Sequence, residues 1–340
     1  MRDVAVIGAG SWGTALAIVL AENCEHVTLW ARREELCRAM RQTRENRDYL
    51  PGVLLPKNIT VTNDLEQAVY KKEAIVLVVP SHTVRSIARQ IAPYIKTCPL
   101  IINCAKGLEE GSHCRMSEIL EQELPQCFPV ILSGPNHAEE VSRRVPSATV
   151  VAAKEERSAK AAQALFMTSR LRVYTNPDVI GVELGGALKN VIAIAAGVSD
   201  GLGYGDNTKA AIVTRGLTEI ARLGRKMGAN PLTFAGLSGV GDLMVTCTSH
   251  HSRNRNLGME IGRGKKLTEI LAGMRMVAEG VRTTKAAKEL GKIYQAEMPI
   301  TEQVYEILFH EKEPRRAVVE LLKRKGKFEI EDVVSFKLQN

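Results

Sequence analysis

One lysine of this sequence lies inside an apolar helical stretch, and such surroundings suit acid–base chemistry. Lys189 interrupts the apolar segment 179–196, and the residues that share its helix face are small: Gly185, Gly186, Ala193 and Ala196. Each glycine costs about 1 kcal/mol of helix stability relative to alanine. We therefore expect the glycines on this face to be needed for close packing or for a ligand. We interpret Lys189 as a catalytic candidate; the alternative is a lysine that extends from a packed helix to solvent.

Lys106 is a second candidate. It follows the apolar run Leu100–Asn103 almost directly and precedes Gly107. A lysine at the end of a strand that borders a ligand can polarise a carbonyl or bind a phosphate. An ordinary exposed loop lysine remains an open alternative.

The segment 238–256 carries a third set of candidates. Asp242 and Thr246 are four residues apart and share one helix face, and Asp242 can also cap that helix. Ser252 can cap a second helix, whose first turn is Arg253–Arg255 and includes Asn254. A helix N-terminus beside a guanidinium group binds anions, which suits a phosphate ester. For Asp242 alone, an ordinary helix cap is the simpler interpretation.

The first thirty-three residues place a glycine turn between a strand and a helix. The apolar run Val4–Ile7 stops at a turn that contains Gly8, Gly10, Ser11, Trp12 and Gly13. An apolar helical pattern follows, and a second apolar run, His26–Trp30, comes after it. Glycines let the backbone approach a pyrophosphate, and the helix N-terminus offers it free N–H groups. The pattern predicts a dinucleotide site.

The residues at the end of the second apolar run indicate whether the site prefers NADPH or NADH. An NAD site usually has Asp or Glu there, whereas this chain has Ala31, Arg32 and Arg33. Guanidinium groups bind a 2′-phosphate that a carboxylate would repel. We therefore predict NADPH in preference to NADH, with NADH still able to bind; the alternative is that both arginines merely face solvent.

A metal is not expected. The pair His250-His251 is adjacent in the chain, and adjacent histidines rarely converge on one zinc. Cys, His and Glu partners at ligand spacing are also missing from the sequence around it. Hydride transfer needs no metal if lysines polarise the carbonyl.

The elements that must position these residues alternate between strands and helices in the first half of the chain. Strands are expected at eight places: 4–7, 26–30, 59–62, 74–79, 100–103, 130–132, 148–152 and 172–174. From about Asn176-Pro177-Asp178 onward the pattern is helical. The prediction is an α/β fold with an N-terminal Rossmann-like, doubly wound, mostly parallel sheet and an all-α C-terminal domain. We place the dinucleotide-binding domain at 1–177 and a substrate domain at 178–340.

Ligands of such sheets bind outside the carboxyl ends of the strands. We therefore expect the glycine turn, Pro80, Lys106 and Gly134 to share one rim, which the helical domain completes.

The amino-acid composition excludes some classes of function and favours others. The net charge is +8 and the sequence pI is about 9.1, but the basic residues are spread along the chain and aromatic residues make up only 4%. Nucleic-acid binding is therefore not expected, while a site for small anions is. The seven cysteines form no C-x-x-C pair and are expected to be buried thiols of a reducing cytoplasm. We expect neither a signal peptide nor an integral membrane contact, and a homodimer is compatible with the sequence.

Motifs along nearly the whole chain resemble the soluble bacterial-type glycerol-3-phosphate dehydrogenases [NAD(P)+]. The resemblance is carried by GAGSWGTALA, LWAR, CAKG, LSGPNHAEE, GVELGGALKNVIAIAAG, GLSGVGDLMVTCTSHHSRNRNLG, VAEGVRTTKA and MPIT, in family order.

The resemblance implies a role for each matching residue. Cofactor contacts would come from Gly8, Gly10, Ser11, Trp12, Gly13, Arg32, Arg33, Lys106, Ala138, Arg253, Val277 and Glu279. Substrate contacts would come from Lys106, Gly134, Asn136, Lys189, Asp242, Ser252, Arg253 and Asn254. Lys189, Lys106 and Asp242 would be catalytic. Asn136 stands where the family commonly has Ser or Thr.

The implied reaction is the reversible reduction of dihydroxyacetone phosphate to sn-glycerol 3-phosphate, which feeds phospholipid synthesis. Lys189 would protonate the forming alkoxide. Two other hypotheses stay open: a related 2-hydroxyacid or ketopantoate-type dehydrogenase, and a non-catalytic NADPH-sensing module.

Overall fold

The computed structural model describes residues 1–95, 98–274, 278–326 and 329, and the chain divides into two compact units. Unit 1 contains Met1–Lys106 and Met116–Val179. Unit 2 contains Gly107–Arg115 and the described residues from Ile180 onward. The short stretch Gly107–Arg115 therefore packs with unit 2 although its neighbours in sequence pack with unit 1.

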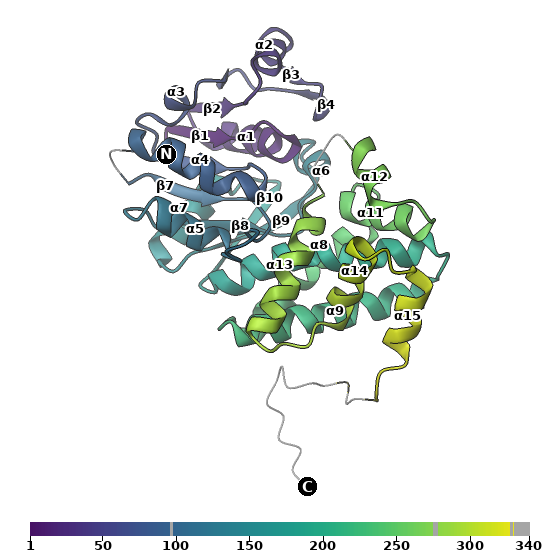
Figure 1. Cartoon of the computed structure of the whole chain (residues 1–340). Coiled ribbons are helices and arrows are strands. Elements are labelled where there is room, and N and C mark those ends of the chain that lie inside the picture. The colour runs from purple at the N-terminus through teal and green to yellow at the C-terminus, as the bar shows by residue number, and fades with distance from the viewer. Residues whose placement is uncertain (96–97, 275–277, 327–328, 330–340) are drawn as a thin grey trace. The chain divides into compact units, whose positions relative to one another are not determined.

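The core of unit 1 is an eight-stranded sheet with the strand order β10-β9-β8-β7-β6-β1-β2-β5 (Figure 1). Its strands are β1 (Asp3–Ile7), β2 (His26–Trp30), β5 (Ile59–Thr62), β6 (Ala74–Leu77), β7 (Leu100–Asn103), β8 (Val130–Ser133), β9 (Ser147–Ala152) and β10 (Leu171–Asn176). Neighbouring strands are parallel except for β8 and β9, which pair antiparallel. The predicted mostly parallel sheet is confirmed, and its central strands β1, β6, β7 and β8 are buried over almost their whole length because both faces are covered.

Two groups of helices pack in unit 1. Helix α1 (Ser11–Asn23) contacts α6 (Ala138–Ser142) and α7 (Glu156–Phe166), while α4 (Val84–Ile91) contacts α3 (Leu65–Val69) and α5 (Met116–Glu123). Short 3-10 turns at Ser81–Thr83 and Ala92–Tyr94 flank α4.

A small hairpin in unit 1 was not expected from the sequence. After α2 (Glu34–Thr43), strands β3 (Glu45–Asn46) and β4 (Leu50–Leu54) pair antiparallel, with an irregular register between Glu45 and Asn46. The hairpin was missed because β3 has only two residues, too few to show an alternating pattern.

Unit 2 is helical, as predicted, with no strand among its described residues. Its helices are α8 (Val179–Gly201), α9 (Asp206–Lys226), α10 (Asp242–Thr248), α11 (Arg253–Gly262), α12 (Leu267–Gly273), α13 (Glu279–Ile293), α14 (Pro299–Phe309) and α15 (Pro314–Leu322). A 3-10 turn, η3 (Pro231–Ala235), and a single π-helical turn, η4 (Leu237–Gly241), precede α10.

Helix α8 is the core helix of unit 2. With 23 residues and a mean hydropathy of 1.6 in its most apolar window, it has the length and composition of a membrane span, although Glu183 and Lys189 interrupt it. However, 89% of that window is buried inside the protein. Burial on all sides explains why the helix is apolar all round.

Close backbone packing holds α8 against α11. A Cβ on Gly197 would lie 1.9 Å from the carbonyl oxygen of Arg255, and one on Gly258 would lie 2.1 Å from that of Ile194. No side chain fits at such distances, so glycine is required on both helices.

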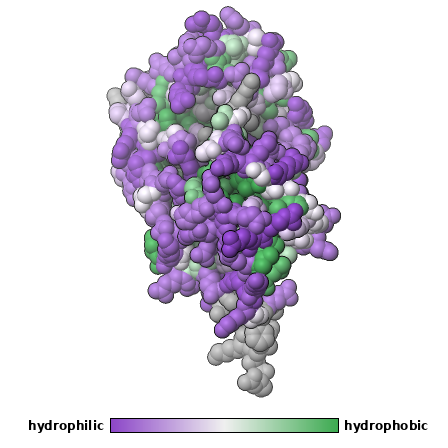
Figure 2. Space-filling model, turned by 45° about the vertical axis from the view of Figure 1, so that its right-hand side comes forward, coloured by the Kyte–Doolittle hydropathy of each residue, from purple (hydrophilic) through white to green (hydrophobic). Residues whose placement is uncertain are grey.

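The surface in the view of Figure 2 is mostly hydrophilic, with small separate hydrophobic patches. All seven cysteines are free thiols. Five are buried, as expected, whereas Cys98 is exposed and Cys114 is half-buried.

Candidate functional site

The glycine turn has the tight geometry expected of a dinucleotide-binding turn. Gly8 has φ +121°, and a Cβ there would lie 2.5 Å from the carbonyl oxygen of Val78. A Cβ on Gly13 would lie 1.8 Å from the carbonyl oxygen of Gly8. A Cβ on Gly10, by contrast, would meet no atom of the described residues within 4 Å, which leaves room for a ligand beside the turn. Ser11 and Trp12 begin α1, directly after Gly10 as its N-cap residue.

Asn46 supports this turn from the hairpin and was missed in the sequence. It is fully buried, and its Nδ2 donates to the carbonyl oxygen of Ala9 at 3.0 Å and to Oγ1 of Thr14 at 2.8 Å. Its Oδ1 has no hydrogen-bond partner among the described residues. The amide therefore fixes the backbone between two glycines. A lone asparagine 33 residues after Gly13 gives no signal of this in the sequence.

The arginines at the end of β2 are exposed, but Arg33 is not solitary. Its Nη2 forms an ion pair with Oδ2 of Asp48 at 2.7 Å, and its guanidinium lies 5.8 Å from the ring centre of Tyr49. Both partners belong to the turn of the β3–β4 hairpin. The sequence identifies Arg33 but does not show that a carboxylate from elsewhere lies against it.

The carboxyl ends of β1, β6, β7 and β8 form one rim, since these strands are neighbours and parallel. Lys106, just after β7, donates from Nζ to the carbonyl oxygen of Gly134 at 3.0 Å. The prediction that Lys106 and Gly134 share this rim is confirmed. Gly134 has φ +151°, and a Cβ there would lie 3.1 Å from Thr149.

Asn136 and Ala138 follow on the same rim, after β8. The Nδ2 of Asn136 donates to the carbonyl oxygen of Ala148 at 2.9 Å. Its Oδ1 is buried and has no hydrogen-bond partner in the described part of the chain. Asn136 is thus fixed by its amide nitrogen, with its oxygen left as an acceptor. Ala138 is buried as the first residue of α6.

In unit 2, the structure brings Lys189 together with Asp242 and Thr246. The Nζ of Lys189 contacts Oδ1 of Asp242 and donates to Oγ1 of Thr246 at 2.7 Å. The hydroxyl of Thr246 donates in turn to the carbonyl oxygen of Asp242 at 2.6 Å. Lys189 is 7% exposed and Asp242 is 1% exposed, so the ammonium and carboxylate are compensated by each other.

Asp242 does not cap a helix, so that part of the prediction is wrong. The N-cap of α10 is Gly241, which has no side chain with which to cap the helix. The π-helical turn η4 continues directly into α10, so Asp242 begins the helix instead of preceding it. Its carboxylate is directed to Lys189.

The small face of α8 explains how Asp242 comes so close. A Cβ on Gly185 would lie 2.4 Å from the carbonyl oxygen of Ser238, which belongs to η4. Because Gly185 is four residues before Lys189, the backbone that leads into Asp242 packs one helical turn from the lysine. The prediction that this face admits a close neighbour is confirmed.

The N-terminus of α11 forms as expected. Oγ of Ser252 accepts a hydrogen bond from the backbone N–H of Arg255 at 3.3 Å, which makes Ser252 the N-cap. Arg253, the first residue of the helix, is exposed beside this N-terminus. A basic residue thus opens the helix directly after its cap, the position in which an arginine of an anion site is expected.

The side chain of Asn254 is buried and makes bonds within the protein. Its Nδ2 donates to Oδ1 of Asn190 at 2.9 Å, and its Oδ1 accepts from the backbone N–H of Gly280 at 3.0 Å. Gly280 follows Glu279, the first residue of α13. Asn254 therefore connects the residue after Lys189 to the turn that carries Glu279. Val277 lies outside the described residues.

Cysteine chemistry does not belong to this site. Burial raises the pKa of the Cys247 thiol, next to Thr246, to about 12. Burial also raises the pKa of Cys104, which follows β7. Both thiols stay protonated at neutral pH and are poor nucleophiles. Among the described residues, no group of three or more His, Cys, Asp or Glu side chains could hold a metal ion.

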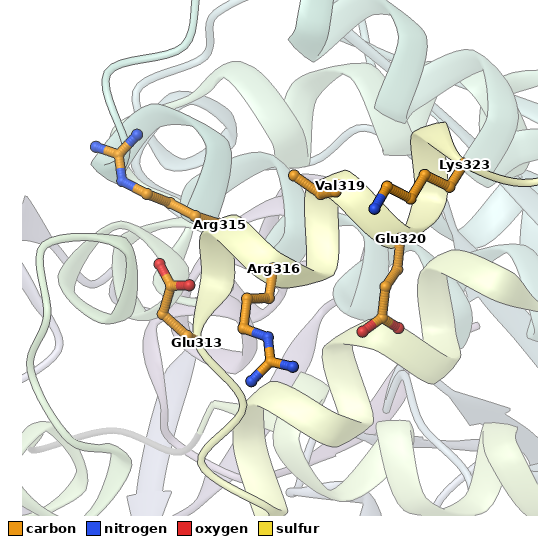
Figure 3. Close-up of a pocket in the computed structure, with 6 residues that line it drawn as sticks. All are labelled: Glu313, Arg315, Arg316, Val319, Glu320 and Lys323. Atoms are coloured by element: carbon orange, nitrogen blue, oxygen red, sulfur yellow. The ribbon is translucent and has the colours of Figure 1, made fainter.

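A surface cavity of about 320 Å³ lies elsewhere, along α15 (Figure 3). Its lining side chains all come from α15 and its flanks: Glu313, Arg315, Arg316, Val319, Glu320 and Lys323. None of them belongs to the predicted site, and their mixed charges select no ligand.

Both halves of the chain match family models of one enzyme group. Residues 3–159 match the NAD-dependent glycerol-3-phosphate dehydrogenase N-terminus, and residues 178–319 match the NAD-dependent glycerol-3-phosphate dehydrogenase C-terminus. A glycerol-3-phosphate dehydrogenase [NAD(P)+] of Pelotomaculum thermopropionicum is 55% identical over 333 residues, which cover 97% of this chain and 95% of the relative. The enzyme of the same name from Bacillus subtilis strain 168 is 52% identical over 338 residues, 98% of each chain. A crystal structure of glycerol-3-phosphate dehydrogenase from Coxiella burnetii superposes with a TM-score of 0.91 at 38% identity, covering 95% of this chain and 99% of that one.

Proposed function

This chain belongs to the NAD-dependent glycerol-3-phosphate dehydrogenase family, and we propose that it reduces dihydroxyacetone phosphate reversibly to sn-glycerol 3-phosphate with NADPH, or less readily NADH. The observation that carries this proposal at the level of chemistry is the buried contact of Lys189 with Asp242 and Thr246. A fixed ammonium of this kind is what a carbonyl reduction needs as its proton source.

The residues of unit 1 fit a dinucleotide. The open space beside Gly10, the close packing at Gly8 and Gly13, and the N-terminus of α1 form a cradle for a pyrophosphate. Ser11, Trp12, Arg32, Arg33 and Ala138 would contact the cofactor around this cradle, as would Lys106, Arg253, Val277 and Glu279 in the family pattern. When bound, the nicotinamide supplies the hydride that reduces the substrate carbonyl carbon.

Lys189 would donate a proton from Nζ to the substrate oxygen that becomes the alcohol, and would accept it back in the reverse reaction. Asp242 and Thr246 hold Nζ in place, so the proton is directed without reorganisation of the site. Asp242 also balances the ammonium charge inside the protein.

Lys106, Gly134 and Asn136 would orient the substrate on the rim of unit 1. The ammonium of Lys106 can polarise the carbonyl oxygen. Asn136 would occupy the substrate-contact position that Ser or Thr commonly holds in the family, with its side chain fixed by the hydrogen bond from Nδ2 to the carbonyl oxygen of Ala148.

The phosphate of the substrate would bind at the N-terminus of α11. Arg253 supplies a guanidinium, and the capped turn of Ser252 and Asn254 supplies backbone N–H groups. Since phosphate binding is remote from the reacting carbon, its energy serves to orient the carbonyl. The product would supply phospholipid synthesis in the cytoplasm, a location that the seven free thiols support.

The decisive experiment follows the loss of NADPH absorbance with dihydroxyacetone phosphate as substrate. K189A should lose roughly 10²–10⁴-fold in kcat, the usual contribution of a general acid, while the Kd for NADPH changes little. K265A removes a lysine that pairs with Glu260 on the surface, and should keep wild-type kcat. Near-normal turnover by K189A would exclude Lys189 as the proton donor.

The choice of substrates tests the two alternatives in the same assay. A ketopantoate-type enzyme would oxidise NADPH with a 2-oxo carboxylate as substrate but not with dihydroxyacetone phosphate. A sensing module would oxidise NADPH with neither dihydroxyacetone phosphate nor the carboxylate substrate.

A further inference from the structure

The β3–β4 hairpin fixes a carboxylate beside the cofactor turn. Two buried residues hold the hairpin: Asn46, hydrogen-bonded to Ala9 and Thr14, and Leu50, which is 1% exposed in the core. Asp48 lies midway between them in the chain. Although half-exposed itself, Asp48 is therefore held in place on both sides by buried anchors.

Asp48 supplies what the end of β2 lacks. In NAD sites an acidic residue at that strand end accepts a hydrogen bond from the ribose 2′-hydroxyl, and here that position holds Ala31, Arg32 and Arg33. The structure brings a carboxylate to the same place from another element, with Oδ2 of Asp48 at 2.7 Å from Nη2 of Arg33.

We propose that Asp48 determines the balance between NADPH and NADH by competing with the 2′-phosphate for Arg33 and by accepting a hydrogen bond from the 2′-hydroxyl of NADH. The inference rests on the proposed use of Arg32 and Arg33 for the 2′-phosphate. With NADPH, Arg33 must exchange or share its carboxylate partner, and the negative charge of Asp48 opposes the phosphate. With NADH, the same carboxylate is a favourable partner.

The other charged residues near Arg33 do not contact it as Asp48 does. Glu34, in the first turn of α2, is paired with Arg41 at 3.7 Å. Glu35 is exposed on the same turn, and Arg32 is exposed beside Arg33. Glu34 therefore contributes general negative charge near the site, whereas Asp48 contacts the arginine itself. This difference provides a matched control.

Calorimetric titration tests the proposal by binding alone. The probes are NADPH, NADH, 2′-phospho-ADP-ribose and ADP-ribose, and the last two remove the nicotinamide from the comparison. In D48N we expect the ratio of Kd for NADH to Kd for NADPH to rise about tenfold, which corresponds to about 1.4 kcal/mol. The two ADP-ribose probes should shift by the same factor, and the shift should shrink at high salt.

The control variant E34Q should change the ratio less than twofold. Asp48→Ser replaces D48N if the asparagine variant does not fold, as judged by circular dichroism. A ratio in D48N within twofold of wild type, or a ratio equally raised by E34Q, would overturn the role of Asp48. Failure of the underlying NADPH preference would appear separately, as tighter binding of NADH than NADPH by the wild-type protein.

Discussion

Glu219 is a fully buried carboxylate whose titration should be visible in the stability of unit 2. It lies on α9 and accepts hydrogen bonds at the start of α14: from the backbone N–H of Ile300 at 2.5 Å, and from the N–H and hydroxyl of Thr301 at 3.2 and 3.1 Å. Burial nevertheless outweighs these bonds and the nearby Arg222, and raises the pKa of Glu219 to about 7.

The size of the effect follows from the difference between this pKa and the ordinary value of 4.5. Between pH 4.5 and 7 the folded state keeps a proton that the unfolded state releases, so stability falls as pH rises. At 1.36 kcal/mol per pH unit, the full effect is about 3 kcal/mol. It is present below pH 4.5 and lost as pH rises through 7, with roughly 2–3 kcal/mol of it between pH 5 and 8.

The substitution E219Q removes the titration while keeping a side chain of the same shape. We expect the free energy of unfolding of wild type minus that of E219Q to fall by roughly 2–3 kcal/mol from pH 5 to pH 8. Because both tryptophans, Trp12 and Trp30, lie in unit 1, urea unfolding is followed by far-UV circular dichroism, which also detects the helices of unit 2.

A matched control is E260Q on α11. Lys265 and Arg263 lower the pKa of Glu260, so it is ionised throughout this range and its difference from wild type should not vary with pH. If the difference in free energy of unfolding between wild type and E219Q is equally independent of pH, the reasoning is refuted. If E219Q does not fold, the wild-type transition seen by circular dichroism should still lose stability from pH 5 to 8.

Two further substitutions test the geometry around Lys189. T246V removes a hydroxyl that accepts from Nζ, and because bonds to charged groups are worth about 1.5–3 kcal/mol, kcat should fall roughly 10- to 100-fold with the Kd for NADPH unchanged; kcat within twofold of wild type would show that Thr246 does not hold the lysine. G185A places a Cβ 2.4 Å from the carbonyl oxygen of Ser238, so it should cost about 1–3 kcal/mol of stability and lower kcat by displacing Asp242. G205A, where a Cβ meets nothing within 4 Å, is its control, and equal effects of the two variants on kcat would contradict the packing argument.

Local patterns in the sequence were sufficient for the sheet and for several site features. The sequence pattern predicted all eight strands of the large sheet: an inner strand such as β6 is continuously apolar because both of its faces are buried, whereas the edge strand β10 alternates between buried and exposed residues. Ser252 was recognised as a cap because a helix N-terminus depends only on its immediate neighbours.

Contacts between distant segments could not be derived from such patterns. The carboxylate of Asp242 reaches Lys189 because η4 packs on Gly185, and a π-helical turn has no periodic signature in its sequence. Asn46 and Asp48 were missed for the same reason, since their importance comes from where the hairpin folds back. In these cases the chemistry depends on contacts between residues that are 15 to 53 positions apart in the chain.

The stretch Gly107–Arg115 has a consequence for the order in which the chain is made. Leu108 is buried in the apolar core of unit 2, and Arg115 forms an ion pair with Glu183 at 2.6 Å, 68 residues further along the chain. When a ribosome has synthesised only the first 179 residues, neither Glu183 nor the rest of the core that buries Leu108 exists yet. The chain passes between the units three times, so a single cut after Val179, in the protein or in its gene, frees all of unit 1 but leaves unit 2 without Gly107–Arg115.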